Sequence, residues 1–297
     1  MLTQDQQNTF LKEGLIRLPG LLPVEYVSAS ADRLFAICKK SKSFNNGQWL
    51  LDDLKAARQL RKQLANSKAF GSLMTPILDG AIRDLVSGRQ LQQRTTRPNL
   101  LFTLPQNYGH ENKLDWHIDV KRLSGMKLAG VQLFAFLESV RPGGGGPVAV
   151  TGSHRIETRE NVPREIIRSQ LRDHAFFADV LDHTPEERAD LVGKRSKLDG
   201  VELAVVELTG EPGDVYLMDL WVLHTRWPNY SDSSRMMLTQ RFLLKEAHER
   251  VGTLIGYSFT LSSFVLDPSL HWGIGSFAPQ RCLRHFVELA PTKRSHA

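Results

Sequence analysis

Residues 211–224 read Glu-Pro-Gly-Asp-Val-Tyr-Leu-Met-Asp-Leu-Trp-Val-Leu-His, which joins a turn, an apolar strand and a histidine in one short stretch. The Pro-Gly pair predicts the turn, and the apolar run that follows is typical of a buried strand. Working outward, short strands with turn residues between them are predicted at 99–104, 114–120, 127–137, 147–150, 201–208 and 235–245. A series of short strands of this kind predicts a β-barrel or β-sandwich core.

Helical patterns flank this predicted core. Val24–Lys39 carries apolar residues at helical spacing, and residues 50–64 and 70–85 are further helical candidates. We find no internal repeat and no linker-like segment. We therefore expect one domain over residues 1–297, made of a helical part at about 1–95, a β core at about 97–245 with a charged helical insertion at about 156–198, and an extension at 246–297.

The motif Trp116-His117-Ile118-Asp119 is the first candidate for chemistry. On a strand, residues two apart point to the same face, so His117 and Asp119 would project together. An imidazole beside a carboxylate supplies two corners of the 2-His-1-carboxylate triad that binds Fe(II). A single His-x-Asp match arises often by chance, so the motif needs a third ligand to carry an assignment.

His224, at the end of the opening stretch, can supply that third ligand. Arg235 starts the next predicted strand, eleven residues further on. Its planar guanidinium can bind a carboxylate through two parallel hydrogen bonds. A dicarboxylic cosubstrate that chelates iron at one end needs such an anchor at the other end. His117, Asp119, His224 and Arg235 thus predict an iron centre beside a carboxylate site.

In their order and spacing, these motifs resemble the phytanoyl-CoA dioxygenase family. The resemblance covers nearly the whole chain. It begins at Phe10–Leu22, continues through the Trp-His-x-Asp motif and the run from Leu137 to Arg155, and ends with Gly213-Asp214, His224, Pro228-Asn229, Ser231 and Arg235. The family implies a double-stranded β-helix, or jelly roll, with helices around it. It also implies an oxygenase that uses Fe(II), 2-oxoglutarate and O2, with Arg235 on the distal carboxylate of the cosubstrate.

The resemblance extends to several further residues. Thr103 corresponds to a polar residue that contacts the cosubstrate in relatives, with Asn99 as a second candidate on the same strand face. Phe134 lies where an aromatic ring packs beside the cosubstrate, although ordinary core packing is an equally good interpretation. His154 is interpreted as structural. Arg226 departs from the family, because many relatives carry serine there; its guanidinium is expected to bind an anionic group of the cosubstrate or of the substrate.

Asp119 bears on the reaction type. Enzymes of this chemistry that halogenate need an open position in place of the carboxylate ligand, so Asp119 favours hydroxylation, with desaturation and ring formation as variants. The insertion at 156–198 is expected to form a lid that helps to select the substrate. A non-catalytic β-barrel binding protein is the alternative, and it would show a broken triad or a missing arginine; neither is found.

The composition sets further limits. Hydrophobic residues make up 41% and charged residues 24% of the chain, which is ordinary for a globular protein. The net charge is +6 and the pI about 9.4, but the basic residues are scattered, which argues against an oxygenase that acts on nucleic acid. Two separate cysteines, no signal peptide and no long apolar segment predict a cytoplasmic protein without a membrane span. The basic excess favours a small anionic substrate; the oligomeric state stays open.

Overall fold

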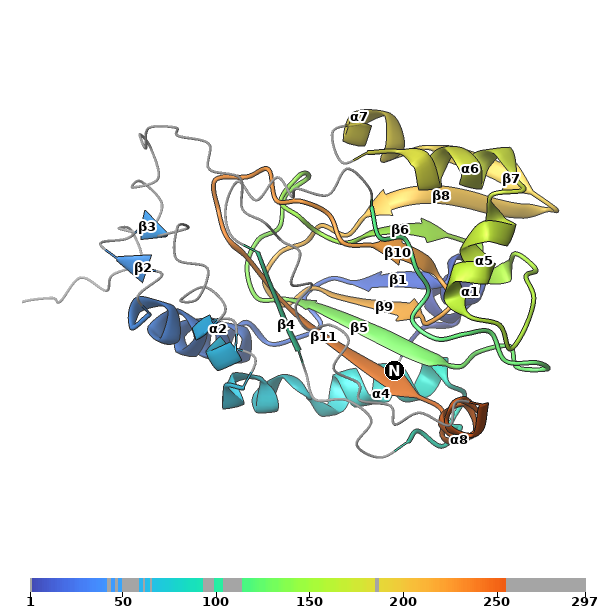
Figure 1. Ribbon diagram of the computed structural model, residues 1–297. Helices are drawn as coiled ribbons and strands as arrows, with labels where there is room; N and C mark the ends of the chain where they lie inside the picture. The colour runs from blue at the N-terminus through green and yellow to red at the C-terminus, as the bar shows by residue number, and fades with distance from the viewer. Residues whose placement is uncertain are drawn as a thin grey trace, which may run out of the picture.

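The computed structural model describes residues 2–41, 44–45, 48–49, 59–60, 62–64, 66–92, 99–103, 114–184 and 187–254. Among these residues most of the strands form two antiparallel sheets that lie one above the other (Figure 1). A cluster of buried side chains from both sheets, including Phe134, Phe136, Ala149 and Met237, fills the space between them. This is the layered arrangement that a jelly roll requires.

The larger sheet has five strands in the order β1 (Leu15–Leu18), β9 (Val215–Asp219), β5 (Gly130–Phe136), β11 (Arg235–Leu243) and β4 (Asn99–Thr103). Every residue of β5 is buried. The reason is that β5 is covered on both faces: its even-numbered residues from 132 to 136 face the second sheet, and its odd-numbered residues pack in the core cluster with the helices. An apolar run, interrupted here only by Gln132, is the sequence pattern of such a strand.

The second sheet has four strands in the order β10 (Leu223–Thr225), β6 (Val148–Thr151), β8 (Val201–Glu207) and β7 (Arg195–Leu198). The strand expected at 114–120 is not regular. This segment joins β10 through a single bridge between His117 and His224, because the N–H of Asp119 bonds outside that ladder, to the carbonyl of Leu220. The expectation of a full strand was wrong, although its pairing with the His224 strand exists.

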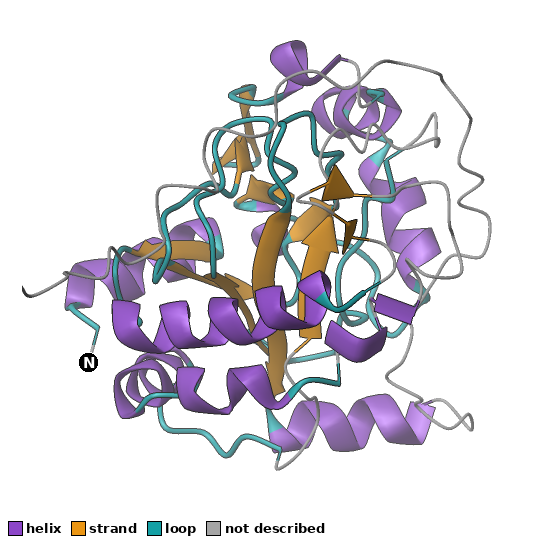
Figure 2. Cartoon of the chain, turned by 90° about the vertical axis from the view of Figure 1, so that its left-hand side faces the viewer, coloured by secondary structure: helices purple, strands orange, loops and turns teal. Residues whose placement is uncertain are grey.

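The helices α2 (Val24–Lys39) and α4 (Pro76–Leu85) pack outside the five-stranded sheet, on the side away from the second sheet (Figure 1). Figure 2 shows these helices lying across the strands. The first helix, α1 (Gln4–Glu13), begins with a capping box between Thr3 and Gln6. It is followed by α2 (Val24–Lys39), whose bounds match the sequence prediction.

The helix predicted over 70–85 is divided into the 3-10 helix η1 (Lys68–Leu73) and α4 (Pro76–Leu85). The break occurs because Pro76 has no N–H to continue a helix, while the hydroxyl of Thr75 accepts from the N–H of Leu78 and so starts a new one. The helix predicted over 50–64 falls mostly outside the described residues.

The insertion forms α5 (Arg164–Leu171), α6 (Ala175–Asp182) and the short α7 (Arg188–Leu191) beside the four-stranded sheet (Figure 1). Its last residues were predicted to be helical, but 195–198 is strand β7, which pairs with β8. The remaining described elements are β2 (Phe44–Asn45), β3 (Gln48–Trp49), η2 (Ser153–Arg155) and α8 (Lys245–Leu254). None of the described helices has the length and apolar character that a membrane-crossing helix needs.

Candidate metal centre

Three side chains from two neighbouring segments converge at one edge of the four-stranded sheet. His117 and Asp119 come from the segment beside β10, and His224 lies on β10 itself. Two backbone hydrogen bonds of 2.9 Å link His117 and His224 in both directions, so the relative position of the two histidines is fixed by the main chain. One ligand atom from each of the three residues lies within 4.8 Å of the others.

Both imidazoles are held in the same way. Nδ1 of His117 donates to the carbonyl of Asp115 at 2.7 Å, and Nδ1 of His224 donates to the carbonyl of Val222 at 3.0 Å. Because a carbonyl oxygen only accepts, the proton lies on Nδ1 and the Nε2 lone pair is available to a metal. Burial lowers the pKa of His224 to about 4, so its imidazole is neutral at neutral pH, as a metal ligand must be.

The carboxylate of Asp119 is completely buried, and its two oxygens have different surroundings. Oδ1 forms an ion pair with Nη2 of Arg241 at 2.5 Å, while Oδ2 lies 4.0 Å from Nε2 of His224. Among the described residues Oδ2 has no hydrogen-bond partner. Burial alone would raise the pKa of Asp119, but Arg241 and the two imidazoles outweigh it and hold the pKa below its usual value. The group is therefore a carboxylate at neutral pH.

This donor set fits a ferrous ion. Two neutral imidazoles and one carboxylate on one side of a metal are the protein ligands of the non-haem Fe(II) oxygenases, which leave the remaining coordination positions open. The orphaned Oδ2 of buried Asp119 supports the fit, since a buried charged oxygen without a partner is costly unless a cation binds it.

A small pocket opens beside this centre, between the two sheets. Arg235, at the start of β11, lies in it with only 4% of its surface exposed. Its Nη1 donates to the carbonyl of Gly145 at 2.6 Å. The pocket is lined by Leu101, His117, Gln132, Phe134, Pro147, His224, Thr225, Arg226, Arg235 and Thr239. A buried guanidinium in such a pocket is suited to an anionic ligand.

The glycine-rich turn explains how Arg235 is held. Gly145 has a φ of +80°, and a Cβ there would lie 2.9 Å from the Cβ of Asn229, so this position requires glycine. Asn229 is completely buried and accepts from the N–H and the hydroxyl of Ser231. The turn and the loop after His224 therefore pack on each other and set the carbonyl that Arg235 contacts.

The other residues singled out in the sequence occupy different places around the pocket. Thr103 lies directly opposite Arg235 in the pairing of β4 with β11, and its hydroxyl is buried without a partner among the described residues. Asn99 lies opposite Thr239, at the other end of the same short strand. Phe134 lines the pocket with its ring centroid 6.5 Å from that of His224. Arg226 is exposed at the rim of the pocket.

Sequence reasoning missed three polar residues of this region: Gln132, Thr239 and Arg241. Gln132 is 3% exposed and donates from its amide nitrogen to the hydroxyl of Thr239, while its amide oxygen has no partner among the described residues. The available signal was the presence of polar residues in otherwise apolar strands. Gln132 interrupts the most apolar run of the chain, and Arg241 follows Arg235 at an even spacing that places both on one face of β11.

Two residues of the sequence motifs, Asp214 and His154, lie away from the pocket and make contacts that hold the fold together. Asp214 accepts from Arg17 at 2.6 Å and from the N–H of Gly20 at 2.8 Å, which holds the turn after β1 against β9. The Nε2 of His154 contacts the carbonyl of Leu11, and among the described residues His154 belongs to no group of potential metal ligands. The interpretation of His154 as structural agrees with this position.

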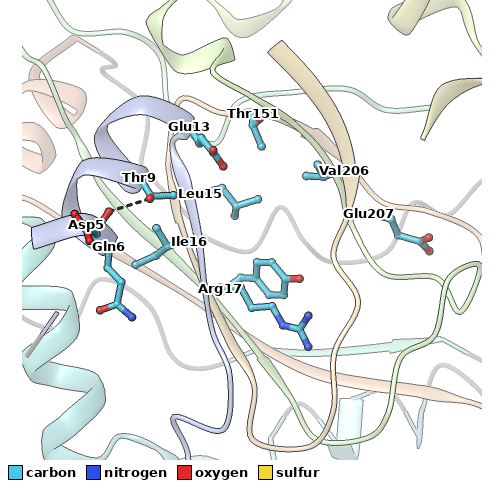
Figure 3. A pocket seen from close by; sticks show the side chains of 11 residues that line it. Asp5, Gln6, Thr9, Glu13, Leu15, Ile16, Arg17, Thr151, Val206 and Glu207 are labelled. Atoms are coloured by element: carbon cyan, nitrogen blue, oxygen red, sulfur yellow. Dashed lines mark hydrogen bonds between the residues drawn. The ribbon is translucent and has the colours of Figure 1, made fainter. Parts of the chain in front are cut away.

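A larger hollow of about 500 Å³ lies elsewhere, between α1, β1 and β8 (Figure 3). It contains none of the triad residues and no potential metal cluster among the described residues. Polar side chains such as Glu13, Arg17 and Glu207 line it, with Arg17 already paired to Asp214. The smaller pocket holds the convergent ligands and the buried arginine, so we locate the chemistry there in spite of its size.

Comparison with known proteins decides the family. The model of the phytanoyl-CoA dioxygenase (PhyH) family matches residues 10–237 of the 297-residue chain. The chain belongs to this family. With the triad in place, this phytanoyl-CoA dioxygenase family member is a 2-oxoglutarate-dependent non-haem iron oxygenase whose cofactors are iron and 2-oxoglutarate. The family acts on small-molecule substrates. The expected double-stranded β-helix with flanking helices is confirmed.

Among solved structures, EvdMO1 has a similar fold. EvdMO1 is 19% identical with a TM-score of 0.50; the match covers 80% of this chain but 49% of that protein, so this chain spans about half of its length. HygX from Streptomyces hygroscopicus with iron bound is 16% identical, with a TM-score of 0.49 and coverage of 82% and 88%. The epimerase SnoN, in complex with Fe3+, alpha ketoglutarate and nogalamycin RO, is 13% identical, with a TM-score of 0.48 and coverage of 86% and 90%. A comparison with curated proteins finds no match.

Proposed function

We propose that this family member hydroxylates an unactivated C–H bond of a small anionic molecule. The observation that carries the proposal is the buried triad of His117, Asp119 and His224 beside a pocket that contains buried Arg235. When bound, iron and 2-oxoglutarate supply the oxidation: one atom of O2 enters the substrate hydroxyl and the other enters succinate, with release of CO2. The presence of the carboxylate ligand Asp119 supports hydroxylation over halogenation.

The chain's own groups would position the reactants. The two imidazoles present Nε2 to the metal because their Nδ1 protons are held by backbone carbonyls. Arg235 would bind the distal carboxylate of 2-oxoglutarate, with the hydroxyl of Thr103 opposite it as a second donor. Phe134 would pack beside the cosubstrate and exclude water. Asn99, opposite Thr239 at the other end of β4, would be a second polar contact for the cosubstrate.

Charge supports the anionic class of substrate. A ferrous ion and 2-oxoglutarate cancel in formal charge, and so do Asp119 and Arg241. This leaves the guanidinium groups of Arg235 and Arg226 in excess, and the described lining of the pocket contains no further acidic residue. Since Arg226 is exposed at the rim, it is placed to meet a carboxylate or phosphate on an entering substrate.

The organisation of the chain is part of the same proposal. We infer that residues 1–297 act as one domain. Residues of the N-terminal helices, such as Phe10 and Leu34, share a buried cluster with Val131 and Leu217 of the sheet, which supports this inference. The insertion would act as a lid. Its helix α5 comes within 4.0 Å of the triad segment, where Arg168 faces Asp115.

The test of the reaction is succinate formation in the presence of small carboxylic acids and acyl thioesters. His117→Ala and Asp119→Ala should abolish it, because each removes one of three metal ligands. Arg195→Met, an exposed substitution on β7, is the matched control and should keep wild-type turnover. Undiminished turnover in both triad variants would remove the iron assignment.

The substrate class has a separate test. Anionic compounds and their neutral methyl esters are compared as pairs, with 2-oxoglutarate consumption above the uncoupled background as the readout. The wild type should prefer the anions by about tenfold, which is ~1.4 kcal/mol for one solvent-accessible charged contact. Arg226→Met should lose that preference. Equal use of acid and ester by the wild type would exclude an anionic requirement.

A further inference from the structure

We propose that Arg241 is a positioning residue of the metal centre, which fixes Asp119 so that one carboxylate oxygen faces the guanidinium and the other faces the metal. The inference rests on the proposed metal site. It is carried by one contact, the 2.5 Å ion pair between Nη2 of Arg241 and Oδ1 of Asp119. Arg241 would act on the reaction only through Asp119.

The strand register explains why Arg241 reaches the site. Arg241 lies near the end of β11, opposite Gln132 of β5, and Gln132 lines the pocket. Arg235 and Arg241 are six residues apart on one strand, so both project from the face that lines the space between the sheets. One strand thus carries two guanidinium groups, one at the proposed cosubstrate anchor and one at the metal carboxylate.

The ion pair also connects the two sheets. Asp119 belongs to the segment that bonds to β10 of the four-stranded sheet, whereas Arg241 belongs to the five-stranded sheet. The side chain of Asp119 has no exposed surface and that of Arg241 is 16% exposed. A carboxylate buried to this degree needs a compensating charge, and Arg241 provides it before any metal binds.

The oxygen that Arg241 contacts determines which oxygen of Asp119 faces the metal site. With Oδ1 held by the guanidinium, Oδ2 is the oxygen left on the side of His224, 4.0 Å from its Nε2. Asp119 would therefore bind the metal through one oxygen, and the position that a second oxygen would occupy stays open for cosubstrate or O2. Hydrogen-bond partners of metal ligands orient those ligands, and their loss typically weakens metal binding by about 10–100-fold.

The experiment measures binding of Mn(II) alone, without 2-oxoglutarate, to wild type, Arg241→Met, Arg241→Lys and the exposed control Arg195→Met. Folding of each variant is checked by circular dichroism. Arg241→Met should raise the Kd for Mn(II) by about 10–100-fold, and the visible absorption of the Co(II)-substituted protein should change as the carboxylate turns. Arg241→Lys keeps a charge but not the planar fork, so it should give a smaller rise and its own spectrum.

The outcomes separate positioning from other roles. If Arg241 merely repelled the cation, Arg241→Met would bind Mn(II) more tightly, and tighter or unchanged binding with an unchanged Co(II) spectrum would overturn the proposal. If Arg241→Met does not fold, Arg241→Lys decides, and a wild-type Kd and spectrum in that variant count against positioning. His117→Ala is measured alongside. Mn(II) affinity that survives in His117→Ala refutes the metal site itself, whereas its loss there with no effect of Arg241 refutes only the present inference.

Discussion

Replacing Arg235 by methionine should raise the Kd and KM for 2-oxoglutarate by about a hundredfold. Arg235 is 4% exposed, so a carboxylate that meets it leaves water almost completely. Each hydrogen bond between charged groups contributes about 1.5–3 kcal/mol, and breaking a fully buried ion pair costs about 3–5 kcal/mol. The pocket opens at its rim, so we take ~3 kcal/mol, which at 1.36 kcal/mol per factor of ten is roughly a hundredfold.

The assay is calorimetry of 2-oxoglutarate binding to the Mn(II) protein, supported by initial rates of succinate formation. Arg235→Lys keeps the charge and loses the two parallel donors, so it should weaken binding by about tenfold. Mn(II) affinity without cosubstrate should stay at the wild-type value in both variants, because the metal ligands remain in place. A wild-type Kd for 2-oxoglutarate in Arg235→Met would refute the assignment of Arg235 as the anchor.

Two buried titratable groups give predictions for stability. Burial raises the pKa of Asp219 from 3.8 to about 7, so between these values the folded protein keeps a proton that the unfolded chain has lost. The free energy of unfolding should therefore fall by up to about 4 kcal/mol as pH rises through this window, and Asp219→Asn should remove the fall in urea titrations. Burial lowers the pKa of His154 from 6.5 to about 4, so here the unfolded chain binds the extra proton. The free energy of unfolding should therefore drop by up to about 3 kcal/mol as pH falls from 6.5 to 4, and the drop should be smaller in His154→Gln. A variant whose free energy of unfolding follows the same pH dependence as the wild type would contradict the corresponding prediction.

Local sequence patterns predicted most of the secondary structure, because the spacing of apolar residues along a segment reflects which face of a helix or strand is buried. The apolar spacing in Val24–Lys39 gave the bounds of α2, and the apolar run at 127–137 predicted β5. The prediction failed at the end of the insertion, where a stretch predicted to be helical forms a strand. Residues 195–198 lie at the end of a charged stretch and were predicted to be helical. They form an edge strand instead, in which Arg195 and Lys197 are exposed and Ser196 and Leu198 are half-buried.

His117 and Asp119 could be proposed as ligands because they are two residues apart in one segment, and the order of the motifs added His224 as the third ligand. Arg241 could not be predicted in this way. Its role depends on a contact between residues 119 and 241 from different sheets, and no local pattern encodes such a contact. Gln132 and Thr239 pose the same problem, since their meeting depends on the register of β5 against β11.

The geometry of the metal ligands depends on the backbone more than on regular strand structure. The segment that contains His117 is not a regular strand, yet two reciprocal hydrogen bonds tie His117 to His224. A pair of this kind fixes which residues lie opposite each other, and a slip of one residue would turn the imidazole of His117 to the other face. The two carbonyls that hold the Nδ1 protons come from Asp115 and Val222, each two residues before its histidine, so the same main chain also sets the tautomers. The position and the tautomer of both imidazoles are thus set by the main chain before a metal arrives, whereas Asp119 is held by a side chain, Arg241.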